Sequence, residues 1–268
     1  MAMKNTIKKI IRTAQSEFYF LKDAKDTFYY HSRRFLARPH EWEFNALRFI
    51  PDCLPGCYLD IGANYGQSIE SIKVVKPAAR IWSFEPNPPL ATRLQHRYCD
   101  RSDITVLSYG LGEKDDAIPL FIPVYKGFVY DGLASFNRKD AEGWLCPDTL
   151  YGFNPEKLEL RETVSVIHRL DDQLLDPVFI KIDVQGYEWH VLRGGIETIE
   201  RHEPILMVEE FRKNKDLINI ITDLGYEEYF FDEMGFYRAD IPDSRNAFLM
   251  TPSRFKTVKQ SQNIIIDK

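Results

Sequence analysis

Two groups of acidic and small residues in this 268-residue chain have the types and spacing of a ligand-binding site. In the first, an apolar run ends in an acid and continues with small residues at every second position: Asp60, Gly62, Asn64 and Gly66. Glycine permits the tight turn that joins a strand to a helix and lets a ligand approach the backbone. The segment therefore predicts a strand, a glycine turn and a helix N-terminus, a corner at which open α/β sheets bind ligands.

Asp60 indicates the charge of the ligand. In dinucleotide-binding turns the glycines let a pyrophosphate reach the helix N-terminus, and a carboxylate two residues before the first glycine would repel it. The middle glycine is also replaced, by an asparagine that tolerates left-handed backbone. A cation suits this turn better, and S-adenosylmethionine carries both a sulfonium and an ammonium group. The turn resembles the first motif of class I methyltransferases, and a tight turn without a ligand is the alternative. We expect this cofactor to contact Asp60, Gly62, Ala63, Asn64 and Gly66.

A second acid ends the next predicted strand. Residues 80–85 are mostly apolar, and Pro86 stops the run. An acid about 20 residues after the glycine turn is placed to accept hydrogen bonds from ribose hydroxyls. We therefore assign Glu85 and Pro86 to the cofactor site, with a solvated carboxylate at a strand end as the alternative.

The second group follows an apolar run over residues 178–182. Asp183 ends this run, and Gly186 turns the chain toward a helix; the strand predicted over 205–209 also ends in an acid, Glu209. Ligands of open α/β sheets bind outside the carboxyl ends of the strands. The sequence therefore predicts that Asp60, Glu85 and Asp183 converge on one crevice.

The alternation of strands and helices predicts one α/β domain over residues 51–268, preceded by a helical extension over 1–50 that caps the site. We expect a seven-stranded, mostly parallel sheet with helices on both faces. Residues 113–177 exceed a usual crossover and predict an inserted β/loop segment that acts as a lid. Further predicted strands are 104–109, 118–124, 163–167, 226–231 and 246–251, and predicted helices are 41–50, 67–76, 90–98, 187–201 and 217–224.

Composition narrows the classes of function. The formal net charge is −5 and no basic stripe is present, which argues against a nucleic-acid binder. No apolar run reaches the length of a membrane span and no signal peptide is recognisable, so we expect a cytoplasmic protein. Near the N-terminus, basic residues and a short apolar stripe predict an amphipathic helix. Such a helix makes weak contact with a membrane surface, or it packs on the domain or on the partner subunit of a homodimer. The four cysteines have no paired metal spacing, and we predict no metal site from them.

Taken together, these segments resemble the FkbM family of S-adenosylmethionine-dependent methyltransferases over roughly residues 43–210. Ser135 falls where that family usually carries a small or hydroxyl residue, whereas Gln185 replaces its usual glutamate. The resemblance implies a class I methyltransferase (Rossmann-like) fold and O-methylation of a hydroxyl on a sugar, glycoconjugate or polyketide-type small molecule. The matching segments, in the family's order, are residues 59–66, 84–88, 170–171, 180–194 and 204–209.

Methyl transfer to a hydroxyl needs alignment of donor and acceptor and removal of the hydroxyl proton. Asp183 is our first candidate for the base or for a group that orients the acceptor, and it also belongs to the expected cofactor site. His168 is the second candidate, because imidazole titrates near neutrality, and Glu209 is the third. Each candidate has an alternative role without proton transfer. Asp183 binds only the cofactor, His168 is an exposed strand residue, and Glu209 caps a neighbouring turn. Mg²⁺ bound by Asp183 and Glu209 is a further alternative that we do not favour.

Two other classes of function stay open. An NAD-dependent oxidoreductase would share the glycine turn, although Asp60 and the missing middle glycine count against it. A non-catalytic binding protein would keep the same strands. The expected partner is in every case a small molecule or a glycan.

Overall fold

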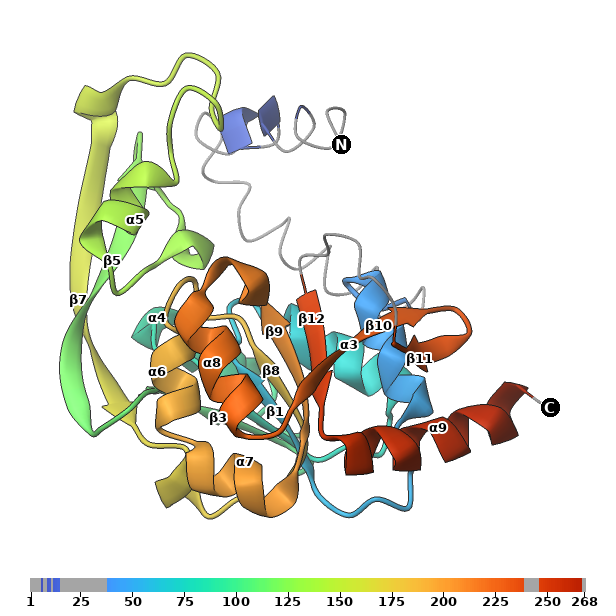
Figure 1. Ribbon diagram of the computed structural model, residues 1–268. Coiled ribbons are helices and arrows are strands. Elements are labelled where there is room, and N and C mark those ends of the chain that lie inside the picture. The colour runs from blue at the N-terminus through green and yellow to red at the C-terminus, as the bar shows by residue number, and fades with distance from the viewer. Residues whose placement is uncertain (1–5, 7–8, 11, 15–37, 239–245, 267–268) are drawn as a thin grey trace.

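An eight-stranded sheet forms the centre of the fold in the computed structural model, which describes residues 6, 9–10, 12–14, 38–238 and 246–266 (Figure 1). Five neighbouring strands are parallel, and three antiparallel strands extend the sheet at one side. In spatial order the parallel strands are β3 (Ile104–Leu107), β2 (Ile81–Phe84), β1 (Cys57–Ile61), β8 (Pro177–Ile182) and β9 (Ile205–Glu209). The antiparallel strands are β12 (Asn246–Met250), β10 (Glu227–Asp232) and β11 (Gly235–Tyr237).

The predicted number of seven strands is therefore wrong, and the sheet is mixed. The eighth strand, β11, is an edge strand of three residues that pairs with β10 in a hairpin. Three residues are too short to display the alternation of apolar and polar side chains by which a strand is recognised in a sequence. The order of the five parallel strands places β1 at their centre, so its carboxyl end lies between those of β2 and β8.

Helices cover both faces of the sheet, as predicted, because successive strand residues point to opposite sides. Tyr58 and Phe179 belong to one apolar cluster, whereas their neighbours Leu59 and Ile180 belong to the other. The first cluster packs against η2 (Trp42–Phe49), α3 (Gln67–Val75), α4 (Pro88–Arg97) and α9 (Pro252–Ile266). The second packs against α6 (Glu188–Arg193), α7 (Ile196–His202) and α8 (Lys215–Asp223).

Two helix predictions are corrected by the structure. The single helix expected over 187–201 is broken into α6 and α7 at Gly194, where a Cβ atom would lie 1.8 Å from the carbonyl oxygen of Gly112. The segment at 42–49 is a 3-10 helix, and its Phe44 and Leu47 are buried in the first apolar cluster. Since η2 is part of this core, the α/β unit begins before residue 51. The C-terminal helix α9 is not among the helices predicted from the sequence.

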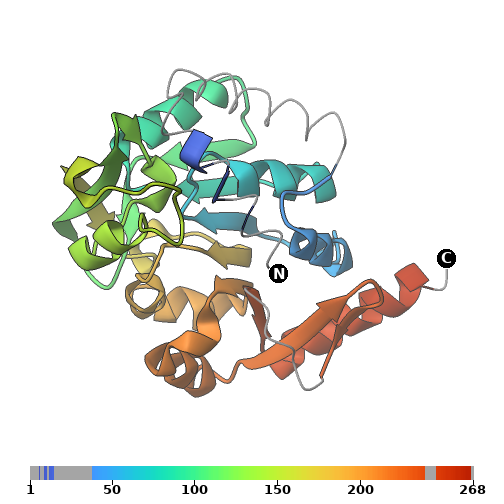
Figure 2. The ribbon, with the colours of Figure 1, turned by 90° about the horizontal axis from the view of Figure 1, so that it is seen from above.

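The predicted insertion is present and forms a second sheet of four strands. Its strands β5 (Asp116–Tyr125) and β7 (Leu158–His168) form one long antiparallel ribbon, flanked by β4 (Gly110–Leu111) and β6 (Phe128–Val129). Between β6 and β7 lie η3 (Asp131–Leu133), α5 (Arg138–Gly143) and η4 (Pro155–Lys157), and η5 (Asp171–Gln173) follows β7. Both strands of the ribbon are longer than predicted. Figure 2 shows the insertion and the C-terminal strands on opposite sides of the molecule.

The described N-terminal residues are helical and lie against the insertion (Figure 1). The Lys9 ammonium donates a hydrogen bond to the carbonyl oxygen of Pro147 at 2.6 Å, and the Tyr130 hydroxyl donates to the carbonyl oxygen of Arg12 at 3.0 Å. The aromatic stretches at 18–21 and 28–31, which are part of the predicted cap, lie outside the described residues. Within the described residues, no helix combines the length and the hydropathy of a membrane span.

Candidate functional site

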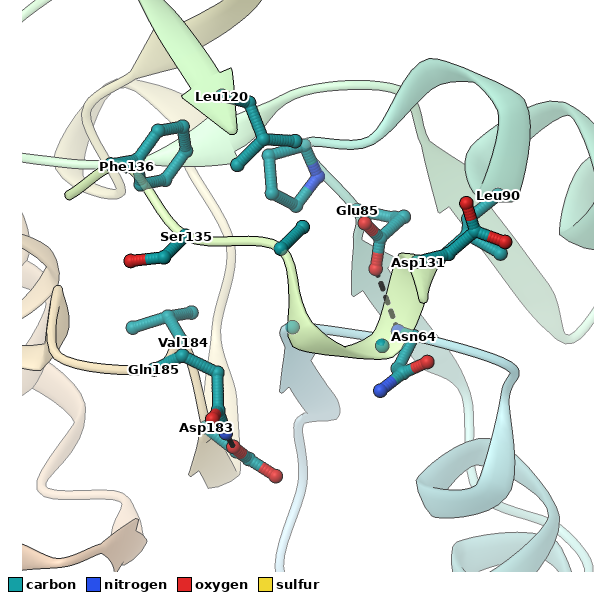
Figure 3. A pocket seen from close by; sticks show the side chains of 14 residues that line it. Asn64, Glu85, Leu90, Leu120, Asp131, Ser135, Phe136, Asp183, Val184 and Gln185 are labelled. Carbon is teal, nitrogen blue, oxygen red and sulfur yellow. Dashed lines mark hydrogen bonds between the residues drawn. The ribbon is translucent and has the colours of Figure 1, made fainter. Parts of the chain in front are cut away.

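A pocket opens at the carboxyl ends of β1, β2 and β8, under the η3–α5 part of the insertion (Figure 3). It holds about 520 Å³ of space outside the protein atoms, including its open mouth. Three of the described lining residues have acidic side chains, and no described lining residue has a basic one. The lining residues are Gly62, Asn64, Glu85, Pro86, Leu90, Leu120, Asp131, Gly132, Ala134, Ser135, Phe136, Asp183, Val184 and Gln185.

The glycine turn has the backbone that the sequence pattern requires. Gly62 has φ +91°, and a Cβ atom there would lie 2.0 Å from the carbonyl oxygen of Asp183, so any side chain would collide with the loop after β8. Asn64 adopts the left-handed region at φ +50°, and Gly66 does so immediately before α3. The turn can therefore lie close to the β8 loop and still present its backbone to the pocket.

Glu85 directly follows β2 and holds the glycine turn in place through a hydrogen bond. Its Oε2 accepts a hydrogen bond from the backbone N–H of Asn64 at 2.6 Å, and its Oε1 accepts one from the backbone N–H of Asn87 at 2.9 Å (Figure 3). Only 5% of the residue is exposed. This burial raises the pKa of Glu85 to about 8. Each carboxylate oxygen has a further lone pair, so Glu85 can accept hydrogen bonds from a ligand as well.

Asp60 is fully buried and does not line the pocket. In the parallel register its neighbours on the adjacent strands are Ser83 and Lys181. The Ser83 hydroxyl donates to Asp60 Oδ2 at 3.1 Å, and the Lys181 ammonium lies 3.7 Å from Oδ1. Burial raises the pKa of Asp60, and the charge of Lys181 opposes that rise. The structure thus places this acid behind the glycine turn, in contact with Ser83 and Lys181, and not at the surface of the pocket.

Asp183 lines the pocket and is held by two donors. Its Oδ2 accepts from the Lys181 ammonium at 3.2 Å and its Oδ1 from the Gln185 amide at 2.8 Å. Burial alone would raise the pKa of Asp183, but Lys181, Glu209 and Gln185 outweigh it and hold the pKa well below its usual range. The pKa of Lys181 is raised, because the neighbouring carboxylates outweigh the effect of burial. Asp183 is therefore ionised at neutral pH and is a weak base.

The other two candidates for the base have different surroundings. Glu209 ends β9, is buried, and accepts a hydrogen bond from the Gln185 amide at 3.0 Å, so it joins the same polar cluster as Asp183. His168 lies on β7, with Nδ1 3.1 Å from Asp115 Oδ1 and its ring edge-on to Tyr109 at 4.7 Å. The structure does not bring His168 to the pocket.

Sequence reasoning predicted that the insertion acts as a lid, but it did not identify Asp131 and Gly132 as residues that line the pocket. Asp131 accepts a hydrogen bond from the Tyr65 hydroxyl at 3.2 Å, and a Cβ atom on Gly132 would lie 3.0 Å from the amide of Asn64. The segment η3 therefore lies directly over the glycine turn. The only signal was an Asp-Gly pair typical of turns, and it does not specify where the turn docks. Lys181 was also missed, although a lysine inside an apolar strand signals a buried ion pair.

Several buried polar atoms around the pocket have no hydrogen-bond partner in the described part of the chain. They are Asn64 Oδ1, both polar atoms of the Asn87 amide, and Asp60 Oδ1. Buried polar groups are normally hydrogen-bonded, and Asn64 lines the pocket. No three side chains of His, Cys, Asp or Glu within the described ranges are grouped so that they could hold a metal ion.

The chain matches one protein family and is similar to several solved structures. The methyltransferase FkbM domain matches residues 60–236, and no curated protein matches the chain. A similar solved structure is the methyltransferase FkbM from Methylobacillus flagellatus KT, with 20% identity over 79% of this chain and a TM-score of 0.46. This chain covers 47% of that protein, so it spans less than half of its length. Another is the precorrin-6y C5,15-methyltransferase from Geobacter metallireducens GS-15, with 14% identity over 77% of this chain and 83% of that one, and a TM-score of 0.37.

The fold is an open α/β sheet with a pocket at the carboxyl ends of its parallel strands. The family match begins at Asp60, at the glycine turn, ends in β11, and covers more than half of the chain. The chain therefore belongs to the FkbM methyltransferase family, as the resemblance of its motifs predicts.

Proposed function

We propose that the protein is an S-adenosylmethionine-dependent O-methyltransferase that acts on a hydroxyl of a sugar, glycoconjugate or polyketide-type small molecule. The observation that supports this best is the charge of the pocket, whose described lining contains Glu85, Asp131 and Asp183 but no basic side chain. Such a lining attracts a sulfonium or ammonium group and can accept hydrogen bonds from ribose hydroxyls. It opposes the pyrophosphate of a nicotinamide dinucleotide. Membership of the family supplies the class of reaction.

The residues present fit this donor. Glu85 retains lone pairs for the ribose hydroxyls after accepting two backbone hydrogen bonds. Asn64 contributes a buried carbonyl oxygen that has no protein partner in the described chain, and the backbone of the glycine turn lies beside it. When bound, S-adenosylmethionine supplies a methyl group that is already activated by the positive sulfur.

In this proposal Asp183 orients the acceptor hydroxyl. S-adenosylmethionine held in this pocket would supply the methyl group for the acceptor oxygen and keep the bonding pair on its sulfur, and the hydroxyl proton would pass to a carboxylate or to water. Alignment of the reacting atoms can supply about 7–11 kcal/mol of the barrier. Because its pKa is low, Asp183 contributes first by holding the hydroxyl and by stabilising the positive charge that develops on the acceptor oxygen.

The test is a pair of measurements on the purified protein. Isothermal titration with S-adenosylmethionine, S-adenosylhomocysteine and NAD identifies the cofactor, and transfer of a labelled methyl group to a panel of glycosides and polyketide alcohols identifies the acceptor class. We expect saturable binding of both adenosyl ligands, no binding of NAD, and labelling of at least one hydroxyl acceptor. Binding of NAD alone would refute the proposal. Binding of the adenosyl ligands without transfer to any acceptor would favour the non-catalytic alternative.

A further inference from the structure

The pocket has two sides that differ in chemistry. Figure 3 shows Glu85 and Asn64 on one side, where we expect the donor. On the other side lie Phe136, Val184 and Asp183, and in this view Val184 separates the ring from the carboxylate. A donor held by Glu85 therefore leaves the second side free for the acceptor, and this side offers an aromatic ring together with a carboxylate.

The Phe136 ring is held in place by its neighbours. Directly before it, Ser135 pairs with Phe121 of β5 through two backbone hydrogen bonds, at 2.9 and 3.0 Å. The centroid of the Tyr187 ring lies 4.7 Å from that of Phe136, and the His190 ring stacks on Tyr187 at 4.2 Å. Phe136 lines the pocket and the other two rings do not. Tyr187 and His190 therefore support Phe136 from outside the pocket.

Two glycines make room for these rings. A Cβ atom on Gly110 of β4 would lie 3.7 Å from Phe136 Cζ, and one on Gly112 would lie 3.2 Å from Tyr187 Cε1, so a side chain at Gly112 would press on the Tyr187 ring. The Tyr187 hydroxyl makes no hydrogen bond to any residue that the structure describes. Tyr187 therefore contributes its ring, and not its hydroxyl, to this arrangement.

Two hydrogen-bond acceptors lie at the other edge of this side. Asp183 and Gln185 both line the pocket. The Gln185 amide nitrogen donates to Asp183 Oδ1 at 2.8 Å, while its amide oxygen accepts no hydrogen bond within the described ranges. The carboxylate and the amide oxygen are thus adjacent, and together they can accept hydrogen bonds from two neighbouring hydroxyls of one ligand.

A sugar ring matches both parts of this side. Its hydroxyls lie on adjacent carbons at the rim, whereas the hydroxyls of a polyketide chain are typically spaced at alternate carbons. One face of a pyranose ring is formed by C–H groups, and the negative face of an aromatic ring attracts such groups. Small-molecule sites commonly combine an apolar wall with a few polar groups that fix the orientation of the ligand.

We propose that Phe136 determines the specificity for the acceptor, and that its ring binds the C–H face of a pyranoside. Asp183 and Gln185 then accept hydrogen bonds from two adjacent hydroxyls of the same sugar. This inference rests on the methyltransferase function proposed above and selects one of the acceptor classes named there. Phe136 contacts the acceptor, whereas Tyr187 is a positioning residue that acts through Phe136.

Saturation-transfer NMR on the full chain measures binding of the acceptor without turnover. The probes are the methyl glycosides of glucose, galactose, mannose, fucose and rhamnose, each with and without S-adenosylhomocysteine. We expect at least one glycoside to bind wild type, with the strongest transfer at its ring C–H protons. Phe136→Leu should weaken this binding about 3- to 10-fold, because leucine is apolar but has no aromatic face. Failure of every glycoside to bind wild type would overturn the proposal.

Kinetics with the glycoside that binds best separate binding from chemistry. Phe136→Leu and Tyr187→Leu should each raise KM about 3- to 10-fold and leave kcat within about threefold of wild type, because the lost contact is made equally before and during methyl transfer. Tyr187→Phe keeps the ring and should keep the KM of wild type. An unchanged KM in both leucine variants, or a Tyr187→Phe variant as impaired as Tyr187→Leu, would contradict the assignment.

Tyr109 provides a matched control for Tyr187. It is also half-buried, its ring also contacts a histidine, His168, at 4.7 Å, and it does not line the pocket. Tyr109→Leu should lower Tm about as much as Tyr187→Leu does, but it should keep the KM of wild type. A KM that rises in all variants in proportion to the loss of Tm would show a general loss of structure and would overturn the specific role of Phe136.

Two further results separate this inference from the proposed function. Methylation of macrolactone alcohols, as polyketide-type acceptors, without methylation or binding of any glycoside would overturn the inference and leave the proposed function standing. Failure of wild type to bind S-adenosylmethionine in titration calorimetry would refute the proposed function, and the NMR measurements would still decide whether Phe136 binds a sugar. All variants should keep the donor Kd of wild type, since Phe136 and Tyr187 lie away from Glu85 and Asn64.

Discussion

Replacement of Glu85 by glutamine tests how the pocket recognises its donor. Glu85 accepts the backbone N–H groups of Asn64 and Asn87 and is 5% exposed, so glutamine fits the space but can accept through only one of its two terminal atoms. Loss of a charge-assisted hydrogen bond costs about 1–2 kcal/mol more than loss of a neutral one. We therefore expect Glu85→Gln to bind S-adenosylmethionine roughly 5- to 30-fold more weakly than wild type at pH 8.

The pH dependence of this effect follows from the burial of Glu85. Its pKa of about 8 means that the carboxyl is mostly protonated at pH 6 in the free protein. Ribose hydroxyls favour the ionised form, so binding of the donor lowers this pKa. The affinity of wild type should then rise toward pH 8, by up to about tenfold per pH unit, whereas Glu85→Gln lacks this dependence.

Titration calorimetry at pH 6, 7 and 8 measures the two proteins side by side. Ionisable groups of the donor titrate identically in both, so the ratio of the two Kd values isolates Glu85. A ratio that stays constant from pH 6 to 8 would show that Glu85 does not contact the donor. Unfolding without ligand gives an independent check. A raised carboxyl pKa stabilises the fold below pH 4.5 and loses this contribution as the pH rises to about 8, so wild type should lose up to about 5 kcal/mol relative to the variant over that range.

Three further predictions concern the neighbouring acids. Asp183→Asn should lower kcat by roughly 10²-fold with less than a threefold change in the Kd of the donor, since the proposed function assigns Asp183 to the acceptor; full activity would exclude it from the reaction. Asp60→Asn should lower the free energy of unfolding by about 3 kcal/mol in urea titrations, because it leaves Lys181 with one buried partner fewer. Since Asp60 does not line the pocket, donor affinity should change little, and a loss of affinity without a loss of stability would contradict this. Treatment with a chelator should leave methyl transfer unchanged, because an amide nitrogen occupies the position between Asp183 and Glu209 that a metal ion would need; loss of activity restored by Mg²⁺ would refute this.

Local patterns in the sequence determine much of this protein. A run of apolar residues that ends in an acid and a glycine specifies a buried strand and its turn, whatever the rest of the chain does. For this reason the sequence places Gly62, Asn64 and Glu85 at strand ends, and parallel strands bring those ends to one edge. The insertion at 113–177 was also predictable, because its length exceeds a usual crossover.

The tertiary structure alone decides which of these groups meet. The register of β1 against β2 and β8 turns Asp60 toward Ser83 and Lys181 and away from the pocket, a distinction that the spacing along the chain does not contain. Docking of η3 on the glycine turn brings Asp131 to the pocket, although it lies 66 positions after its contact Tyr65 in the chain. The amide of Gln185 finds Glu209 only because β8 and β9 are neighbours. Sequence patterns fix local backbone and burial, whereas contacts between distant strands depend on register and docking, and these determine which acids are paired and which face a ligand.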